Sequence, residues 1–246
     1  MNKKMTLPLL LTIFSSSVFA ALPKPSPSTM TSAMEIIKLP AENRRAALEG
    51  QGDKFYSSFV EIAFNNTETM NVRWRAVMAA AEAGGEKATA DLLKAGEHDQ
   101  WYMRNAALVA LAEVNPAQSQ KLAQKLLKDK ALVVRSAAVE ALDSSEKKLS
   151  PEVRDLLWDE LNQDYNFKGG QSLWIRHQIV EVLAKRPQNN ELGIFADLLS
   201  DKDTRVRLPA VGGLEKLTGV KLGEEELKQS DLVKLWKDYI RKEKLL

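Results

Sequence analysis

The chain has 246 residues, with 35 lysines and arginines against 33 aspartates and glutamates, so its formal net charge is +2. It contains no cysteine, which excludes disulfides, thiol catalysis, cysteine-ligated zinc and a lipid anchor attached through cysteine. Hydrophobic residues make up 44% and charged residues 28%, a balance typical of globular chains of one large or two small domains.

The first 20 residues predict a secretory signal peptide rather than part of the fold. Lysines at positions 3 and 4 precede an apolar run over residues 7–14, and Val18 and Ala20 fit a cleavage site after position 20. The run is shorter than the roughly 20 residues that a membrane-spanning helix needs. We therefore expect an exported protein, periplasmic or secreted, with no stable membrane insertion after cleavage.

Residues 21–34 are expected to form an extended linker rich in proline and serine. Prolines at positions 23, 25 and 27 disfavour both a helix and a central strand. The folded region is then expected to cover residues 35–246.

A helical pattern recurs five times in that region. Relative to one arginine, apolar residues stand at positions −1, +3, +4 and +7, and a small or apolar residue stands at +6, which is the spacing of one helical stripe. Leu-Leu-x-Asp precedes two of the arginines by six residues and indicates the end of an earlier helix. Each unit is thus a helix pair too small to bury its apolar face alone, so the units must stack. The arginines are Arg73, Arg104, Arg135, Arg176 and Arg207, at spacings of 31, 31, 41 and 31 residues.

The pattern Asp, then Val-Arg-x-x-Ala-Val-x-x-Leu, over roughly residues 40–220, resembles the HEAT-repeat family in the short form found in phycobilisome-lyase-like repeats. The resemblance implies an all-α, armadillo-type fold, a right-handed α-solenoid of about five to six stacked helix pairs. It also implies that the arginine-bearing helix is the second of each pair and lines a concave side. We expect residues 38–50 and 53–64 to form a degenerate first repeat.

The end of the chain and the fourth and fifth units depart from the pattern. Residues 224–246 are expected to cap the stack with a helix that directs Leu232, Leu235, Trp236 and Ile240 to one face. The longer arginine spacing indicates an insertion within residues 146–170. There, a helix over 151–162 replaces the missing first helix, with Leu156, Leu157 and Leu161 inward, and residues 165–170 form a loop. Pro209, Gly212 and Gly213 weaken the fifth arginine helix, which we expect to bend or to start late.

The arginines have two possible roles, a phosphate-binding row or a structural one, and the sequence favours the structural role. The guanidinium fork can bond a carboxylate or the carbonyls of the turn between helices. The acidic residues that precede the arginines are Asp99, Asp129, Asp201 and Asp203.

The positions one and five residues after each arginine are the candidate partner-binding surface, which we call the ribbon. It changes from apolar and aromatic to acidic along the chain, which suits a protein or peptide interface. Alternatively, Trp74 and Met78 complete the packing against the first repeat. The candidates are Trp74, Asn105, Ser136 and His177 at +1, and Met78, Val109, Glu140 and Glu181 at +5, with Leu208 and Gly212 at the fifth unit.

The remaining conspicuous residues indicate no chemistry. His98 and His177 are the only histidines and have no metal-ligand spacing, so we expect no metal and no cofactor. Trp101, Tyr102 and Trp174 align with apolar residues and are expected to pack between repeats, and Trp158 and Trp236 on helical stripes are expected in the core.

The sequence thus favours an exported, non-enzymatic α-solenoid that binds a protein or peptide partner, an envelope component, on its concave face. One alternative is a bilin lyase-like enzyme or chromophore binder, by kinship of the repeats, and another is a HEAT-like nucleic-acid-binding protein. Without the two lysines of the signal peptide the chain has 33 basic and 33 acidic residues. This balance disfavours nucleic acid, while the oligomeric state stays open.

Overall fold

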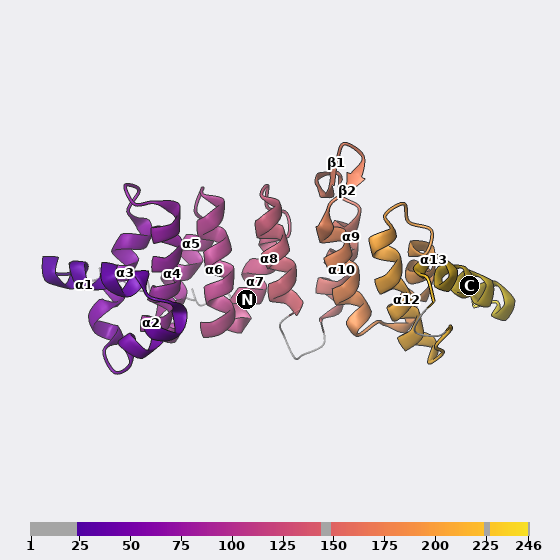
Figure 1. Cartoon of the computed structure of the whole chain (residues 1–246), viewed down its shortest axis with the longest axis horizontal. Coiled ribbons are helices and arrows are strands. Elements are labelled where there is room, and N and C mark those ends of the chain that lie inside the picture. Colours follow the sequence, from indigo (N-terminus) through magenta and orange to yellow (C-terminus); the bar gives the residue numbers. More distant parts are fainter. Residues whose placement is uncertain (1–23, 144–148, 224–226, 246) are drawn as a thin grey trace, which may run out of the picture.

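The computed structural model describes residues 24–143, 149–223 and 227–245. Within these residues the helices follow one another in one elongated row (Figure 1). Two short strands, β1 (Phe167–Lys168) and β2 (Gln171–Ser172), pair antiparallel in a small hairpin that projects from the row. The all-α fold class is therefore confirmed, whereas the predicted signal peptide lies outside the described residues.

Within the described ranges, five helix pairs make up the stack, and the second helix of each pair carries the repeat arginine. Each second helix packs against the next, while the first helices make fewer contacts with one another. The second helices therefore form the more closely packed layer. The pairs are α3 (Gly52–Phe64) with α4 (Met70–Gly84), α5 (Thr89–Gly96) with α6 (Trp101–Val114), α7 (Pro116–Leu126) with α8 (Leu132–Asp143), α9 (Pro151–Leu161) with α10 (Trp174–Lys185), and α11 (Leu192–Leu198) with α12 (Thr204–Thr218). Single 3₁₀ turns lie at Gly85–Ala88 (η1), Asp164–Asn166 (η2) and Asn189–Glu191 (η3).

The predicted stripe explains this close packing. In α8 the apolar side chains at −1, +4 and +7 are Val134, Val139 and Leu142, and each is at most 1% exposed. The residue at +3 is an alanine in four of the five units, and all four alanines are fully buried, which lets neighbouring helices approach closely.

A proline after a short polar residue starts three of the helices. Ser150 accepts a hydrogen bond from Val153 N at the start of α9, and Asn115 caps α7 in the same way, each with proline at the first helical position. The same signal at Ser26–Pro27 starts α1 (Pro27–Lys38). The prediction of an extended linker is therefore wrong from Pro27 onward, because proline at this position favours a helix start.

The expected first repeat is also wrong in its pairing. Residues 53–64 lie in α3, which pairs with α4, and α2 (Ala41–Leu48) packs against α4 instead of forming a pair with α3. The buried guanidinium of Arg44 holds α2 there through two hydrogen bonds to Glu82, at 2.5 and 2.7 Å. Only Arg44 and Leu48 are buried in α2, too little for the first helix of a repeat.

The later units follow the predictions more closely. In α9, Leu157 and Leu161 are buried and Leu156 is partly buried. In the capping helix α13 (Gln229–Glu243), Trp236 and Ile240 are buried and Leu232 is partly buried, but Leu235 is 42% exposed, so its inward placement is wrong. None of the described helices is both long enough and apolar enough to span a membrane.

Candidate functional site

Arginines join each unit to the next. Arg73, Arg104, Arg135 and Arg176 are between 2 and 7% exposed, and Arg207 is half-buried. A guanidinium that is buried between units and fully hydrogen-bonded has no free fork for a phosphate. The burial of these side chains therefore supports the structural role.

Asp129 shows how the connection works. Its carboxylate accepts hydrogen bonds from Nε and Nη2 of Arg104, in the preceding unit, at 2.5 and 2.7 Å. Its backbone carbonyl accepts from Nη1 of Arg135, in its own unit, at 2.7 Å. One aspartate thus links two successive arginines, through its side chain and through its backbone.

His98 occupies the equivalent place one unit earlier, six residues before Arg104. Its carbonyl accepts from Nη1 of Arg104 at 2.8 Å, and its Nε2 lies 3.1 Å from Nη2 of Arg73. Burial, and then the charges of Arg73 and Arg104, lower the pKa of the imidazole. Arg73 therefore faces an imidazole where Arg104 has a carboxylate.

The other partners of Arg73 are neutral as well. Its Nη1 donates to the Tyr102 hydroxyl and its Nε to the carbonyl of Ala63, both at 2.9 Å. Asp99, predicted as an acidic partner, contributes its backbone carbonyl to Arg104 at 2.8 Å. The side chain that contacts the preceding unit's arginine is therefore the one six residues before the next arginine, Asp129 or His98, and not that of Asp99.

The inserted segment supplies the partners of Arg135. The Nε of Arg135 donates to Oδ1 of Asn166 at 3.0 Å, and Nη2 donates to the carbonyl of Tyr165 at 2.8 Å. Asn166 is fully buried, and its amide donates to the carbonyl of Glu160. Six residues before Arg176, where the neighbouring units have Asp129 and Asp201, the fourth unit has Gly170. The insertion therefore supplies Asn166 as the partner of Arg135 in place of an aspartate.

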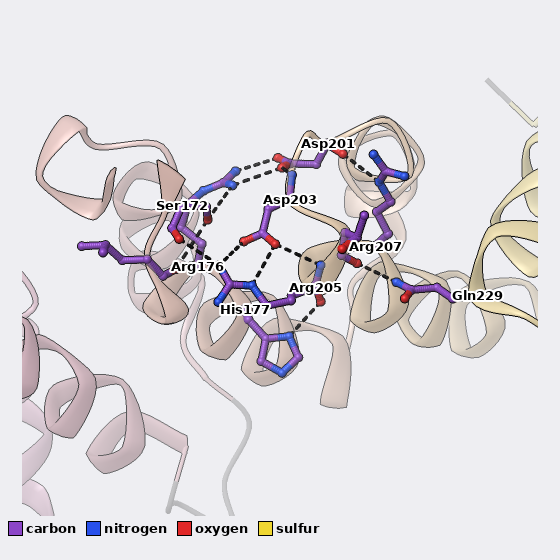
Figure 2. A network of polar contacts seen from close by, with 10 residues as sticks. Ser172, Arg176, His177, Asp201, Asp203, Arg205, Arg207 and Gln229 are labelled. Carbon is purple, nitrogen blue, oxygen red and sulfur yellow. Dashed lines mark hydrogen bonds and ion pairs between the residues drawn. The ribbon is translucent and has the colours of Figure 1, made fainter. Parts of the chain in front are cut away.

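A polar network joins the fourth and fifth units, as Figure 2 shows. The Asp201 carboxylate accepts from Nη1 and Nη2 of Arg176 at 3.1 and 2.7 Å, and its carbonyl accepts from Nε of Arg207 at 2.7 Å. Asp203 accepts from Nε of Arg205 at 2.9 Å. A cleft of about 630 Å³ opens beside the network, but the two ion pairs in its lining, Arg176–Asp201 and Arg205–Asp203, already satisfy these four charges.

These contacts lower the pKa values of the Asp203 and Asp201 carboxyl groups. Burial alone would raise the pKa of Asp203, but hydrogen bonds from Arg205 and Ser172 outweigh burial and bring the pKa to about 2. Burial opposes the shift of Asp201 in the same way, and hydrogen bonds from Arg176 lower its pKa overall. Both carboxylates are thus stabilised as anions.

His177 forms a second link between these units, to the backbone carbonyl of Arg205 (Figure 2), and Pro209 lies four residues after Arg205 in the same helix. Proline has no N–H, so the carbonyl four residues earlier, that of Arg205, lacks its helical donor. Nδ1 of His177 donates to this oxygen at 2.8 Å, and Nε2 lies 3.4 Å from Glu181. The helix α12 starts three residues before its arginine, as α4, α6 and α8 do, so the expected late start is wrong.

The ribbon residues are only partly available to a partner. Met78 is 7% exposed and Ser136 8% exposed, so both are buried. Trp74 is half-buried, and its indole N–H donates to Asn105 at 3.3 Å. Val109 is 37% exposed, and Glu140 and Glu181 are exposed. The accessible part of the ribbon therefore runs from Val109 to Leu208 and includes both glutamates, whereas Met78 belongs to the core.

Two tryptophans expected in the core lie at the surface instead. Trp101 is 40% and Trp174 46% exposed, whereas Tyr102 is buried. The indole N–H of Trp174 donates to Ser136 Oγ at 3.3 Å, across α10 and α8, so Trp174 lies beside the ribbon. Trp236 is in the core as expected, and Trp158 is half-buried with its N–H donating to Glu191.

A buried ion pair that the sequence does not indicate joins α9 to the 3₁₀ turn η3, which precedes α11. Arg154 of α9 donates through Nε and Nη2 to the Glu191 carboxylate at 2.8 and 2.5 Å. The two residues are 37 positions apart and belong to no repeated motif. Across the described ranges, no cluster of three or more histidine, aspartate or glutamate side chains is arranged to hold a metal.

This chain is similar to a family model and to solved structures of other proteins. A family model described as HEAT repeats matches residues 56–143 and 89–169. The crystal structure of YibA from E. coli aligns with a TM-score of 0.55 and 17% identity, over 88% of this chain and 82% of that chain. The crystal structure of an engineered protein aligns at 0.44 and 16% identity, over 77% and 89%. No curated protein sequence shows significant similarity.

Proposed function

Because this chain is a HEAT-repeat protein, we propose that the surface of its second helices binds a protein or peptide partner without catalysis. Stacked repeats present an extended surface whose side chains come from successive units. The observation that carries the proposal is the row of exposed apolar side chains on this surface. Val133 is 37%, Trp174 46% and Leu208 51% exposed, although each belongs to a helix whose other apolar residues are buried or partly buried.

Hydrogen bonds hold part of this surface in place. Ser136 contacts Gln178 at 2.8 Å and accepts from Trp174, and the Gln178 amide donates to Glu140 at 3.2 Å. Side chains fixed before binding lose less conformational entropy when a partner arrives. Interface hot spots are enriched in tryptophan, and Trp174 is held here among polar side chains.

The acidic side chains define the preferred partner. Glu140 and Glu181 lie on adjacent second helices, α8 and α10, and both are exposed. This surface repels phosphate backbones and attracts basic segments. A protein partner is therefore favoured over nucleic acid.

We also propose that the protein is exported and meets its partner in the bacterial envelope. The basic start and apolar run of residues 1–20 support this location. Fractionation of cells that produce the full chain tests it, with N-terminal sequencing of the product. A mature protein that starts at Ala21 outside the cytoplasm is expected, and an uncleaved cytoplasmic chain contradicts the proposal.

Affinity capture from envelope extract tests the binding surface. The variant Trp174→Ser with Glu181→Lys changes the surface of the second helices. The control Ile194→Ser with Glu97→Lys also replaces one exposed apolar residue and one exposed glutamate, but on α11 and directly after α5. We expect the first variant to lose partners that the wild type and the control retain. Equal recovery by all three proteins contradicts the proposal.

A further inference from the structure

A small open hollow lies between α6 and α8, on the surface of the second helices. Its volume is about 280 Å³, and it is lined mainly by Val109, Ala112, Ala137 and Ala141, with Glu113 and Glu140. This volume lies just below the range of about 300–1,000 Å³ that is usual for small-molecule pockets. It suits one side chain presented by another polypeptide.

The alanines explain why the hollow exists and what it accepts. Ala137 and Ala141 are buried in α8 and Ala112 is half-buried in α6, so methyl groups stand where larger side chains would fill the space between the helices. A floor of methyl groups offers no hydrogen bond. It therefore favours an aliphatic side chain.

The carboxylates beside the hollow add a charge preference. Glu140 accepts only the amide of Gln178, and it has no cationic partner among the described residues. Glu113 pairs with Arg45 at 3.0 Å, but the two side chains are 48% and 57% exposed. An exposed pair of this kind is weak, so Glu113 can be shared with an incoming cation.

A second hollow continues the first toward α2. It has a volume of about 550 Å³, shares Glu113 with the first, and is lined by Leu48, Glu49 and Ala81 among others. Glu49 is exposed and has no cationic partner among the described residues. A peptide anchored between α6 and α8 could thus extend past the Arg45–Glu113 pair and along Leu48 and Ala81, toward the carboxylate of Glu49.

We propose that the hollow between α6 and α8 anchors a basic peptide segment of the partner, with one aliphatic side chain inserted and a neighbouring lysine or arginine beside Glu140. This inference rests on the proposed function and adds the chemistry of the partner. Charge complementarity selects the basic segment, and the size and apolar floor select the aliphatic anchor.

Selection of a phage-displayed random nonapeptide library on the purified protein tests this inference. We expect enriched peptides to contain leucine, isoleucine or methionine next to lysine or arginine. In fluorescence polarisation, Ala112→Phe, which fills the hollow, and Glu140→Lys, which reverses its charge, should each weaken binding about 10-fold or more. The control Glu97→Lys, at the end of α5, should not change it.

A charge swap separates the peptide contact from any effect on folding. A peptide with glutamate in place of its basic residue should bind Glu140→Lys better than the wild type does. No enriched peptide, enriched peptides without the aliphatic–basic pair, or binding indifferent to Ala112→Phe would overturn the inference. In affinity capture, the double variant Trp174→Ser with Glu181→Lys can lose a partner that Ala112→Phe retains. That result would overturn the inference about the hollow and leave the proposed function standing.

Discussion

Replacement of Arg104 by alanine tests the role of the repeat arginines. The substitution removes the two hydrogen bonds to the Asp129 carboxylate and those to the carbonyls of His98 and Asp99. The Asp129 side chain is only 5% exposed, so its charge would stay buried without its cation. Breaking a buried pair in this way costs about 3–5 kcal/mol, a large part of the stability of a small domain.

Urea unfolding followed by circular dichroism measures the effect on the free energy of unfolding. Lys125→Ala is the matched control, because Lys125 and Glu97 also pair between adjacent units but are 63% and 67% exposed. The control should change the free energy of unfolding by less than about 1 kcal/mol. If Arg104→Ala shifts the unfolding midpoint no more than Lys125→Ala, the arginines do not hold the units together.

Three further substitutions test particular contacts by the same unfolding measurement. His98→Asp gives Arg73 a carboxylate and should stabilise the protein by about 1 kcal/mol, and no gain refutes the equivalence with Asp129. Gly212→Ala has open space around its new Cβ and should stabilise α12 by about 1 kcal/mol. Gly213→Ala places its Cβ 2.8 Å from the Phe195 ring and should destabilise by about 1–3 kcal/mol; effects of the same sign refute this. Asp203 has a pKa of about 2 against its ordinary 3.8, so its contribution is complete above pH 4 and is lost as the pH falls toward 2. Asp203→Asn should lose less stability than the wild type between pH 5 and pH 2, and equal losses contradict this.

The repeat structure could be predicted because each unit repeats the same physical requirement. An apolar stripe recurs around each arginine and a buried alanine around four of the five, so a weak signal at any one position is reinforced at the others. The helix over residues 151–162 followed from the same stacking requirement, although its motif is absent there. Contacts without a periodic signal, such as Arg44 with Glu82, depend on chain segments that only the folded structure brings together.

Most errors at the candidate site have local causes. Trp174 was expected to pack between repeats, but it lies in the first turn of α10 with its side chain exposed. Tyr102 holds the same repeat position and is buried, and its hydroxyl accepts a hydrogen bond from Arg73. His98 was considered only as a metal ligand, and that role was rejected, whereas its distance of six residues from Arg104 could have placed it with Asp129. At Pro27 the three prolines suggested an extended chain, but the preceding serine makes the third one a helix start.

Site-specific photocrosslinking in cells tests most directly whether the surface of the second helices binds the partner. A photoreactive amino acid replaces Trp174 on α10 in one protein and Ile194 on α11 in another, two positions of similar exposure at 46% and 40%. Crosslinked adducts to another protein are expected from position 174 and not from position 194. Adducts from position 194 alone, or equally from both, would contradict the proposed binding surface.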